Sequence, residues 1–163
     1  MDFSNIFLTH KINYYIIITG DIMNENLVIS KIYGVYEGEF DNGFIPHKSR
    51  GRHSDCFVYF IEGDIKYTFD SYTLHTGKDG LIYLAEGSIY SINIKKPCKH
   101  IYVDFRFENN DKKSCVFKNI SPSVKSEFIK LFYTWNKKQN AVFQKMMIQS
   151  ILTQLFIQEK RKR

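Results

Sequence analysis

Seven short segments rich in β-branched and aromatic residues lie between residues 27 and 107, and turn residues separate most of them. These segments are LVISKIYGVY (27–36), CFVYFIEG (56–63), IKYTFD (65–70), YTLHTG (72–77), LIYLAEG (81–87), IYSINI (89–94) and HIYVDFRF (100–107). Glycine, aspartate or proline occurs at most of the junctions. Many short strands at this spacing are typical of an antiparallel sandwich or barrel. The sequence therefore predicts a mainly β fold.

The alternation of side chains divides each predicted strand into two faces. In the segment 100–107, one face carries Ile101, Val103, Phe105 and Phe107, and the other carries His100, Tyr102, Asp104 and Arg106. One face is thus fully apolar, and the other combines a histidine and a tyrosine with two charged residues. We expect the apolar face of this strand to pack against helices and the less apolar face to line a cavity.

The hydrophobic period becomes helical after residue 120. The segment SPSVKSEFIKLFYTWNKK opens with serine and proline, which is typical of a helix N-terminus, and apolar residues follow at positions 128, 131, 132 and 135. A second helix is expected over about 140–158, with an apolar arc wider than one packing face requires. We expect this helix to cover the barrel and also to form a homodimer through Phe143, Met147, Ile151 and Leu155. The alternative is a helix buried entirely in its own core.

Length and charge limit the class of protein. A chain of 163 residues with 44% apolar residues fits one domain. The net charge is +6, but Lys160, Arg161, Lys162 and Arg163 end the chain. Without them, 19 basic side chains stand against 17 acidic ones. The body is nearly neutral, so the sequence does not predict a continuous basic face for nucleic acid.

The cysteines and the N-terminal segment indicate the compartment. Cys56, Cys98 and Cys115 are odd in number and widely spaced, which argues against a disulfide framework and fits a reducing cytosol. The apolar run YYIIIT (14–19) is shorter than the core of a signal peptide and far too short to span a bilayer. We expect a cytoplasmic protein with no membrane segment.

The sequence contains no local catalytic signature. The five histidines, at positions 10, 47, 53, 75 and 100, include no H-x-H pair. A G-x-S-x-G motif and a phosphate-binding glycine loop are both missing. The carboxylates are scattered in turns, and no two stand out as an acid–base pair. We therefore expect a protein that is not an enzyme and carries no cofactor.

The order of these segments resembles a cupin barrel, and their details resemble the sensing domain of AraC/XylS-type transcription regulators. The residues that carry the resemblance are RGRHSDCFVYFIEGDIKYTFDSYTLHTG (50–77), DGLIYLAEGSIYSI (79–92), CKHIYVDFRF (98–107) and FIKLFYTWNKKQNAVFQKMMIQSILTQLF (128–156). In that family, a G-D-l-i-y-l-P-x-G type loop precedes a strand, an F-x-F strand follows, and a tryptophan lies in the first helix. Here the glycine–aspartate pair is reversed as Asp79-Gly80, and Ala85 replaces the loop proline.

The resemblance implies a mainly β fold with C-terminal helices, namely a cupin-like jelly-roll antiparallel β-barrel followed by two α-helices. We expect a single effector-binding and dimerisation domain over 1–163, with an N-terminal arm (1–26), the barrel (27–107) and the two helices (121–158). Regulators of this family end in paired helix-turn-helix units that read DNA. This chain ends at QEKRKR, where such units would begin, so DNA binding is expected only through a part absent from it.

Metal-binding cupins place two histidines and a glutamate on one strand and a further histidine after P-x-G-x-x. The first place here holds RHSDC (52–56), in which only His53 is a histidine, and Tyr90 stands where the later histidine would be. A neutral phenol is a poor ligand for a divalent ion. The resemblance therefore predicts a barrel without a metal.

The family binds small polar molecules, sugars among them, inside the barrel. Applied to this chain, the resemblance points to these ligand-binding residues: Lys48, Arg50, Arg52, Tyr90, Ile92, His100 and Tyr102. The basic residues would donate charged hydrogen bonds to ligand oxygens, and the aromatic residues would form the walls. For Tyr90 and His100, we also weigh purely structural roles, as a filling side chain and as a half-exposed strand residue.

Three functions remain open at this stage. The first is an effector-binding domain of a bacterial regulator, in which the ligand sets the orientation of DNA-binding domains. The second is a small cupin enzyme, such as a metal-dependent isomerase or oxygenase. The third is a barrel with a filled interior that serves only to dimerise.

Overall fold

The computed structural model describes residues 28–47, 50–108, 113–137 and 141–160. The predicted arm (1–26) lies outside these ranges. The strands are β1 (Ile29–Phe40), β2 (Gly43–Ile45), β3 (Asp55–Thr68), β4 (Thr73–Gly77), β5 (Leu81–Leu84), β6 (Ser91–Phe107) and β7 (Cys115–Phe117). The helices are α2 (Pro122–Asn136) and α3 (Ala141–Lys160). The predicted order of a β region followed by two helices is confirmed.

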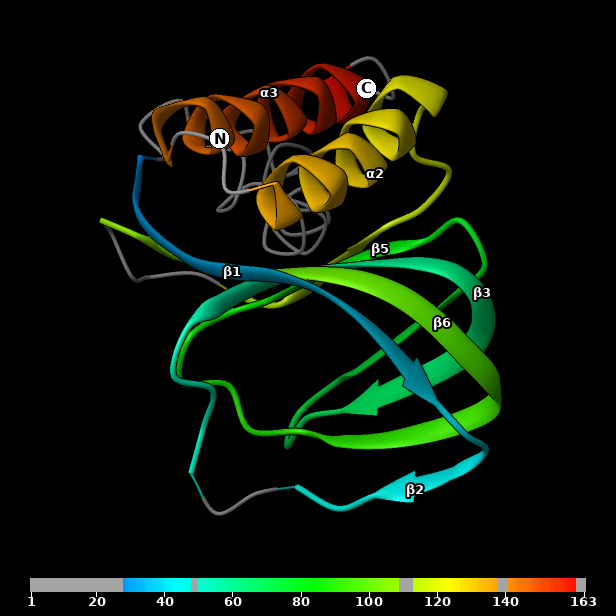
Figure 1. The fold of residues 1–163 in the computed structure, drawn as a ribbon. Helices are drawn as coiled ribbons and strands as arrows, with labels where there is room; N and C mark the ends of the chain where they lie inside the picture. The colour runs from blue at the N-terminus through cyan, green and yellow to red at the C-terminus, as the bar shows by residue number, and fades with distance from the viewer. Residues whose placement is uncertain (1–27, 48–49, 109–112, 138–140, 161–163) are drawn as a thin grey trace, which may run out of the picture.

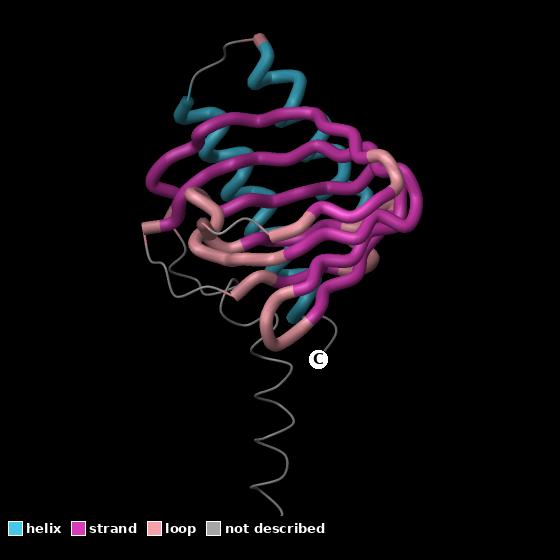
Figure 2. The backbone as a smooth tube through the Cα atoms, turned by 90° about the horizontal axis from the view of Figure 1, so that it is seen from below, coloured by secondary structure: helices cyan, strands magenta, loops and turns pink. Residues whose placement is uncertain are grey.

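The strands form an antiparallel sheet in the order β1-β6-β3-β5-β7, with β2 added on β6 and β4 added on β3. Figure 1 shows α2 and α3 lying side by side over one layer of strands, with β2 on the opposite side of the barrel. The view from below shows the strands running roughly alongside one another in front of the helices (Figure 2). The fold is cupin-like, as the sequence predicted.

Two long strands replace four of the predicted short ones. Segments 56–63 and 65–70 belong to the single strand β3, and segments 89–94 and 100–107 largely belong to β6. The pairing of β3 with β6 shifts register between Phe60 and Ile65, where the ladder is irregular. Gly63 lies there with φ of +119°, and a Cβ atom on it would overlap Cys98, at about 2.3 Å from the sulfur. Gly63 therefore marks a bend within one continuous strand and not a turn between two strands.

The two faces of the sheet bury two separate clusters. On the helix side, Phe57, Val103 and Phe105 pack with residues of both helices. On the barrel side, Val58, Phe60 and other residues from the strands fill the interior. The alternation in β3 and β6 therefore separates a helix-facing core from a barrel-facing core, as the sequence predicted for the last long strand.

Helix α2 begins as its sequence predicts. Ser121 is the N-cap, and its hydroxyl accepts a hydrogen bond from the backbone N–H of Val124 at 3.3 Å. Pro122 follows in the first turn. Phe128 and Leu131 are fully buried, whereas Phe132 and Trp135 are partly buried against the same cluster. The stripe at helical spacing is therefore core packing.

Helix α3 buries most of the side chains that were assigned to the dimer contact. Met147, Ile151 and Leu155 are at most 4% exposed and belong to the helix-facing core, whereas Phe143 is 39% exposed. The apolar side chains of this helix that remain on the surface include Phe143 and Met146. A dimer contact on α3 would therefore use the start of the helix and not the three buried residues.

The helices of the described ranges were also compared with the requirements of a membrane span. None of them combines the length and the apolar character that crossing a bilayer requires.

Candidate functional site

A cavity of about 390 Å³ opens between the end of β1, β2, the loop before β3 and the loop between β5 and β6. Its lining residues are Phe40, Ile45, Pro46, Arg50, Gly51, Arg52, His53, Ser88, Ile89, Tyr90 and Ile92. The volume lies in the range of small-molecule sites, and the lining combines an apolar wall with a few polar groups. This cavity is the candidate ligand site.

Two backbone hydrogen bonds join the two loops that form its polar wall. The N–H of Arg52 donates to the carbonyl of Ser88 at 3.1 Å, and the N–H of Gly87 donates to the carbonyl of Arg52 at 2.8 Å. A Cβ atom on Gly51 would lie about 2.2 Å from the carbonyl oxygen of Gly87, so the close approach requires glycine at residue 51. The loops are held as one unit.

The loop between β5 and β6 keeps its turn without the proline of the family pattern. The N–H of Ser88 donates to the carbonyl of Ala85 at 3.2 Å, and the Ser88 hydroxyl donates to the same oxygen at 2.6 Å. Gly87 supplies the positive φ of +78° that the turn requires. Replacement of the proline by Ala85 is therefore compatible with the same loop shape.

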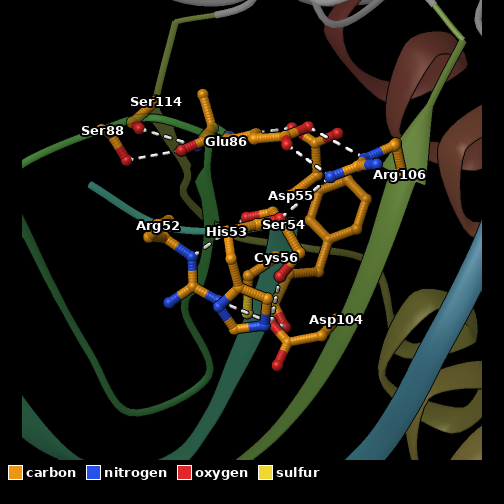
Figure 3. Close-up of polar contacts among 12 residues, drawn as sticks. Arg52, His53, Ser54, Asp55, Cys56, Glu86, Ser88, Asp104, Arg106 and Ser114 are labelled. Carbon is orange, nitrogen blue, oxygen red and sulfur yellow. Dashed lines mark hydrogen bonds and ion pairs between the residues drawn. The ribbon is translucent and has the colours of Figure 1, made fainter. Parts of the chain in front are cut away.

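Arg52 is the centre of a polar cluster behind the cavity wall. Its Nη1 donates to the Tyr90 hydroxyl at 3.0 Å, and its Nη2 forms an ion pair with Asp104 Oδ1 at 2.5 Å. The Ser54 hydroxyl also donates to Asp104 Oδ1, at 3.3 Å. Figure 3 shows Arg52 and Asp104 approaching one another from a loop and from β6. One guanidinium thus ties the loop before β3 both to Tyr90 and to β6.

The charges of this cluster are internally balanced. Burial alone would lower the pKa of Arg52, but the neighbouring Cys56, Tyr90 and Asp104 outweigh it and hold this pKa above its ordinary value. Burial raises the pKa of the Tyr90 phenol, and the nearby Arg52 offsets part of that rise. At neutral pH the wall therefore presents a compensated ion pair and a neutral hydroxyl group.

The ring of Tyr90 also belongs to the barrel core. It lies 5.2 Å from the ring of Tyr67 and 5.3 Å from that of Phe69, measured between ring centroids. The Tyr90 hydroxyl group accepts a hydrogen bond from Arg52. Tyr90 therefore combines core packing with a polar group at the cavity wall.

His100 and Tyr102 lie on the barrel-facing side of β6 but not in the lining of the cavity. The His100 ring stacks on Phe40 at 4.6 Å between centroids, and the Tyr102 ring stacks on Tyr36 at 5.1 Å. His100 is 4% exposed, so the half-exposed position considered from the sequence is wrong. Since Phe40 lines the cavity and covers His100, this phenylalanine separates the histidine from the cavity.

The His100 imidazole is buried without a full set of partners. Its Nδ1 atom accepts and donates no hydrogen bond within the part of the chain that the structure describes. Burial lowers the pKa of His100 from 6.5 to about 4. The ring is therefore neutral at physiological pH, and it carries an unused polar atom in the barrel interior.

The structure brings together four of the seven predicted ligand-binding residues. Arg50, Arg52, Tyr90 and Ile92 line the cavity. His100 is buried, Tyr102 is partly buried against the barrel core, and Lys48 lies outside the described residues. Sequence reasoning missed Asp104 and Ser54. Asp104 shares its strand face with His100 and Tyr102, so the alternation of β6 was a signal for it.

A second polar cluster lies on the other side of β3. Asp55 is 2% exposed, and its carboxylate accepts bonds from the Tyr83 hydroxyl at 2.6 Å and from the backbone N–H of Phe107 at 3.0 Å. Arg106 forms a two-pronged contact with Glu86 nearby, at 2.6 and 3.2 Å. Figure 3 shows these groups on the far side of Ser54 from Asp104. These contacts fix the loop between β5 and β6 from behind.

The residues at the place of the family's metal do not fit a divalent ion. Asp104 is already paired with the Arg52 guanidinium, which would repel a cation, and the third group present is the neutral Tyr90 phenol. Across the described ranges, no three His, Cys, Asp or Glu side chains are grouped as metal ligands.

Comparisons with known proteins were made for the whole chain. No protein-family model matches the chain, and no curated protein matches its sequence. Solved structures do resemble it. ToxT from Vibrio cholerae, an AraC-family regulator, aligns with a TM-score of 0.55 at 7% identity over 74% of this chain and 55% of ToxT. At this identity, the likeness shows the fold alone.

Cupin proteins are also among the structural neighbours. EutQ from Clostridium difficile aligns with a TM-score of 0.42 at 18% identity, over 47% of this chain and 57% of EutQ. The Cnp3 cupin domain of Schizosaccharomyces pombe aligns with a TM-score of 0.38 at 23% identity, over 51% of this chain and 69% of that domain. The chain thus matches little more than half of EutQ and of ToxT.

Proposed function

We propose that this chain is the effector-binding and dimerisation domain of a bacterial AraC-type transcription regulator. The cavity carries the proposal, because four residues chosen as ligand contacts line one space of about 390 Å³. The fold likeness to ToxT supports it, since the alignment covers 74% of this chain, more than a barrel alone. Binding of the effector would set the orientation of the DNA-binding domains of the full regulator.

The polar wall favours a small neutral ligand rich in hydroxyl groups, for example a sugar. Arg52 and Asp104 compensate one another, so the cluster does not require a charged ligand to neutralise it. Tyr90 offers a hydroxyl group, and the exposed Arg50 adds donors at the mouth. The apolar wall, from Phe40 to Ile92, would pack against the carbon skeleton of the ligand.

Strand β1 connects the cavity with the two helices. Its end at Phe40 lines the cavity, whereas Ile29 at its start packs in the same cluster as residues of α2 and α3. The Lys145 ammonium group on α3 donates to the carbonyl of Ser30 at 2.9 Å. A ligand that displaced Phe40 would thus act on a strand that directly contacts α3. This is the element that we propose the effector biases.

The proposed role is binding and not catalysis. The pKa of Tyr90 is raised, away from neutrality, which suits a hydrogen-bonding group and not a proton-transfer group. Arg52 is held in place by its two partners and remains charged. Both properties fit a rigid recognition wall.

A thermal-shift screen against sugars and small polar metabolites tests the proposal. A ligand that stabilises the protein should lose about tenfold in affinity in Tyr90→Phe, which removes only the hydroxyl group. Tyr133→Phe on α2, where the side chain is 61% exposed, is the matched control and should bind as the parent does. Equal affinity in both variants, or no stabilising compound in the screen, would refute the proposed site.

Elemental analysis of the purified protein separates this proposal from a cupin enzyme. We expect no stoichiometric iron, manganese, nickel or zinc, because the Arg52 guanidinium occupies the surroundings of Asp104. One equivalent of such a metal, lost in Asp104→Asn, would favour the enzyme instead.

A further inference from the structure

A second cavity, of about 580 Å³, lies where the bend of β3, the β4–β5 turn and the start of α2 meet. Its lining residues are Gly63, Asp64, His75, Thr76, Gly77, Lys78, Asp79, Gly80, Lys96, Lys118, Asn119 and Lys125. None of these residues lines the first cavity. The proposed effector site therefore leaves this space unexplained.

Glycines allow the bend of β3 and the β4–β5 turn to approach one another closely at this cavity. A Cβ atom on Gly77 would lie about 2.6 Å from the carbonyl oxygen of Gly63, and a Cβ atom on Gly80 would overlap the Thr76 hydroxyl. The N–H of Lys78 donates to the carbonyl of Gly63 at 3.1 Å, which ties the turn to the bend. The backbone of Lys78 is thus fixed against the bend of β3.

The two carboxylates of the lining already have cationic or imidazole partners. Asp79 accepts from the Lys125 ammonium group at 3.0 Å and from the Tyr59 hydroxyl at 3.2 Å, and the Lys125 hydrogen bond lowers the pKa of Asp79. Asp64 contacts His75 Nε2 at 2.5 Å, and this hydrogen bond lowers the pKa of Asp64. Both carboxyl groups are therefore ionised and matched at neutral pH.

The remaining charge of the lining is positive. Four lysines, at positions 78, 96, 118 and 125, stand against Asp64 and Asp79. Lys125 is matched with Asp79, and Lys78 and Lys96 add positive charge to the lining from the β4–β5 turn and from β6. Positive charge concentrated in a concave space attracts small anions more strongly than the same charge spread over a flat surface.

We propose that this cavity is a second binding site, for a small polyanion of the phosphate class that carries at least two negative charges. Lys78 and Lys96 approach the space from the β4–β5 turn and from β6, so a diphosphate or a phosphorylated metabolite could contact both. Lysine ammonium groups suit this ligand because they are compact charges with freely rotating donors.

The two carboxylates favour a discrete anion over a nucleic acid. Asp64 and Asp79 lie in the same lining as the lysines, and they would repel a continuous phosphate backbone laid across the opening. A small anion can lie between them and contact only the ammonium groups. The predicted near-neutral body of the chain agrees with this choice.

Isothermal titration calorimetry with pyrophosphate tests the site at fixed ionic strength. We expect saturable binding by the parent protein and about tenfold weaker binding by the double variant Lys78→Gln/Lys96→Gln. The control variant Lys130→Gln/Lys137→Gln removes the same charge from exposed lysines of α2 and its C-cap, outside the lining, and it should bind as the parent does.

Each outcome of this experiment decides the proposal. Weakening confined to the Lys78 and Lys96 variant, with both variants folded by circular dichroism, supports a built site. Equal weakening in both double variants would show diffuse attraction and overturn it. Absence of pyrophosphate binding would also overturn it, as would binding of a short DNA duplex with the same lysine dependence in place of pyrophosphate.

Discussion

The Nη2 atom of Arg52 lies 2.5 Å from Oδ1 of Asp104, and this ion pair joins the loop before β3 to the last part of β6. The two side chains are only 20% and 13% exposed. The pair therefore lies in a medium where its attraction is stronger than at the surface. It holds the loop that carries the lining residue Arg52 to β6, so both stability and ligand binding should depend on it.

Removal of one partner of this pair should destabilise the fold. In Asp104→Asn, Arg52 keeps its charge without a counter-charge, and we expect a loss of about 2–3 kcal/mol in the free energy of unfolding. Urea unfolding followed by circular dichroism measures this loss. Arg52→Lys should also lose stability, because an ammonium group cannot contact Tyr90 and Asp104 together in the geometry of a guanidinium.

The exposed pair of Lys99 and Glu39 is the control for this experiment. Its atoms are 3.5 Å apart, and its side chains are 51% and 70% exposed. Lys99→Gln should therefore change the free energy of unfolding by no more than about 0.5 kcal/mol. Similar losses in Lys99→Gln and Asp104→Asn would contradict the special role of the buried pair.

The buried His100 should make the protein less stable in acid. Its pKa is lowered from 6.5 to about 4 in the folded state, so the unfolded chain binds the proton more readily between these values. Stability should therefore fall as the pH drops from 6.5 to 4, by up to about 3 kcal/mol from this residue. Denaturant unfolding at several pH values in this window measures the slope.

Replacement of the histidine identifies its share of that slope. His100→Gln removes the titrating group, so the dependence on pH between 6.5 and 4 should become shallower. His53→Gln, at an exposed position, should keep the slope of the parent. An NMR titration of the His100 ring with a midpoint near 6.5 would contradict the burial argument.

Alternation and period in the sequence predicted much of the architecture. Strand faces were correct in β6, where Val103 and Phe105 face the helices and Tyr102 faces the barrel. The Ser121 and Pro122 pair placed the start of α2 correctly. These features depend on local chemistry, namely side-chain alternation and capping, which a single sequence contains.

Long-range pairing explains what the sequence did not reveal. The sequence pattern predicts the end of a strand at Gly63. In the structure Cys98 packs against this glycine, and the strand bends there and continues. The partner of Arg52 is Asp104, 52 residues away, and no local spacing indicates that contact. Likewise, the burial of His100 depends on Phe40 from another strand. Each of these depends on strand register, which a single sequence specifies weakly.

The close contact between Gly38 and His100 predicts that Gly38→Ala changes the stability in opposite directions with and without the His100 ring. A Cβ atom on Gly38 would lie about 2.6 Å from Nε2 of His100, and the buried ring has little room to move. Gly38→Ala should therefore destabilise the parent by about 1–2 kcal/mol. In a His100→Ala background the space is open, and the same change should stabilise by about 0.5 kcal/mol because alanine has less unfolded-state entropy.

Thermal unfolding of the four proteins of this cycle measures both effects. Since Gly38 has no positive φ, backbone strain does not complicate the substitution. An equal loss of stability from Gly38→Ala with and without the His100 ring would show that the ring contact is not the cause.

The start of α3 gives a test of the proposed dimer, through two neighbouring methionines with opposite environments. Met147 is 4% exposed in the helix-facing core, whereas Met146 is 65% exposed near Phe143. Met147→Glu buries a charge among apolar groups and should cost more than about 3 kcal/mol in the free energy of unfolding. Met146→Glu should leave that energy within about 0.5 kcal/mol of the parent, because the side chain already contacts solvent.

The same two variants separate association from folding in sedimentation velocity experiments. If the exposed apolar start of α3 forms the dimer contact, Met146→Glu should shift the protein to a monomer while its unfolding curve is unchanged. Phe143→Gln, at the neighbouring exposed position, should shift it in the same direction. A dimer that survives both substitutions would place the contact on the barrel instead, and a parent protein that is monomeric at all concentrations would refute the dimer.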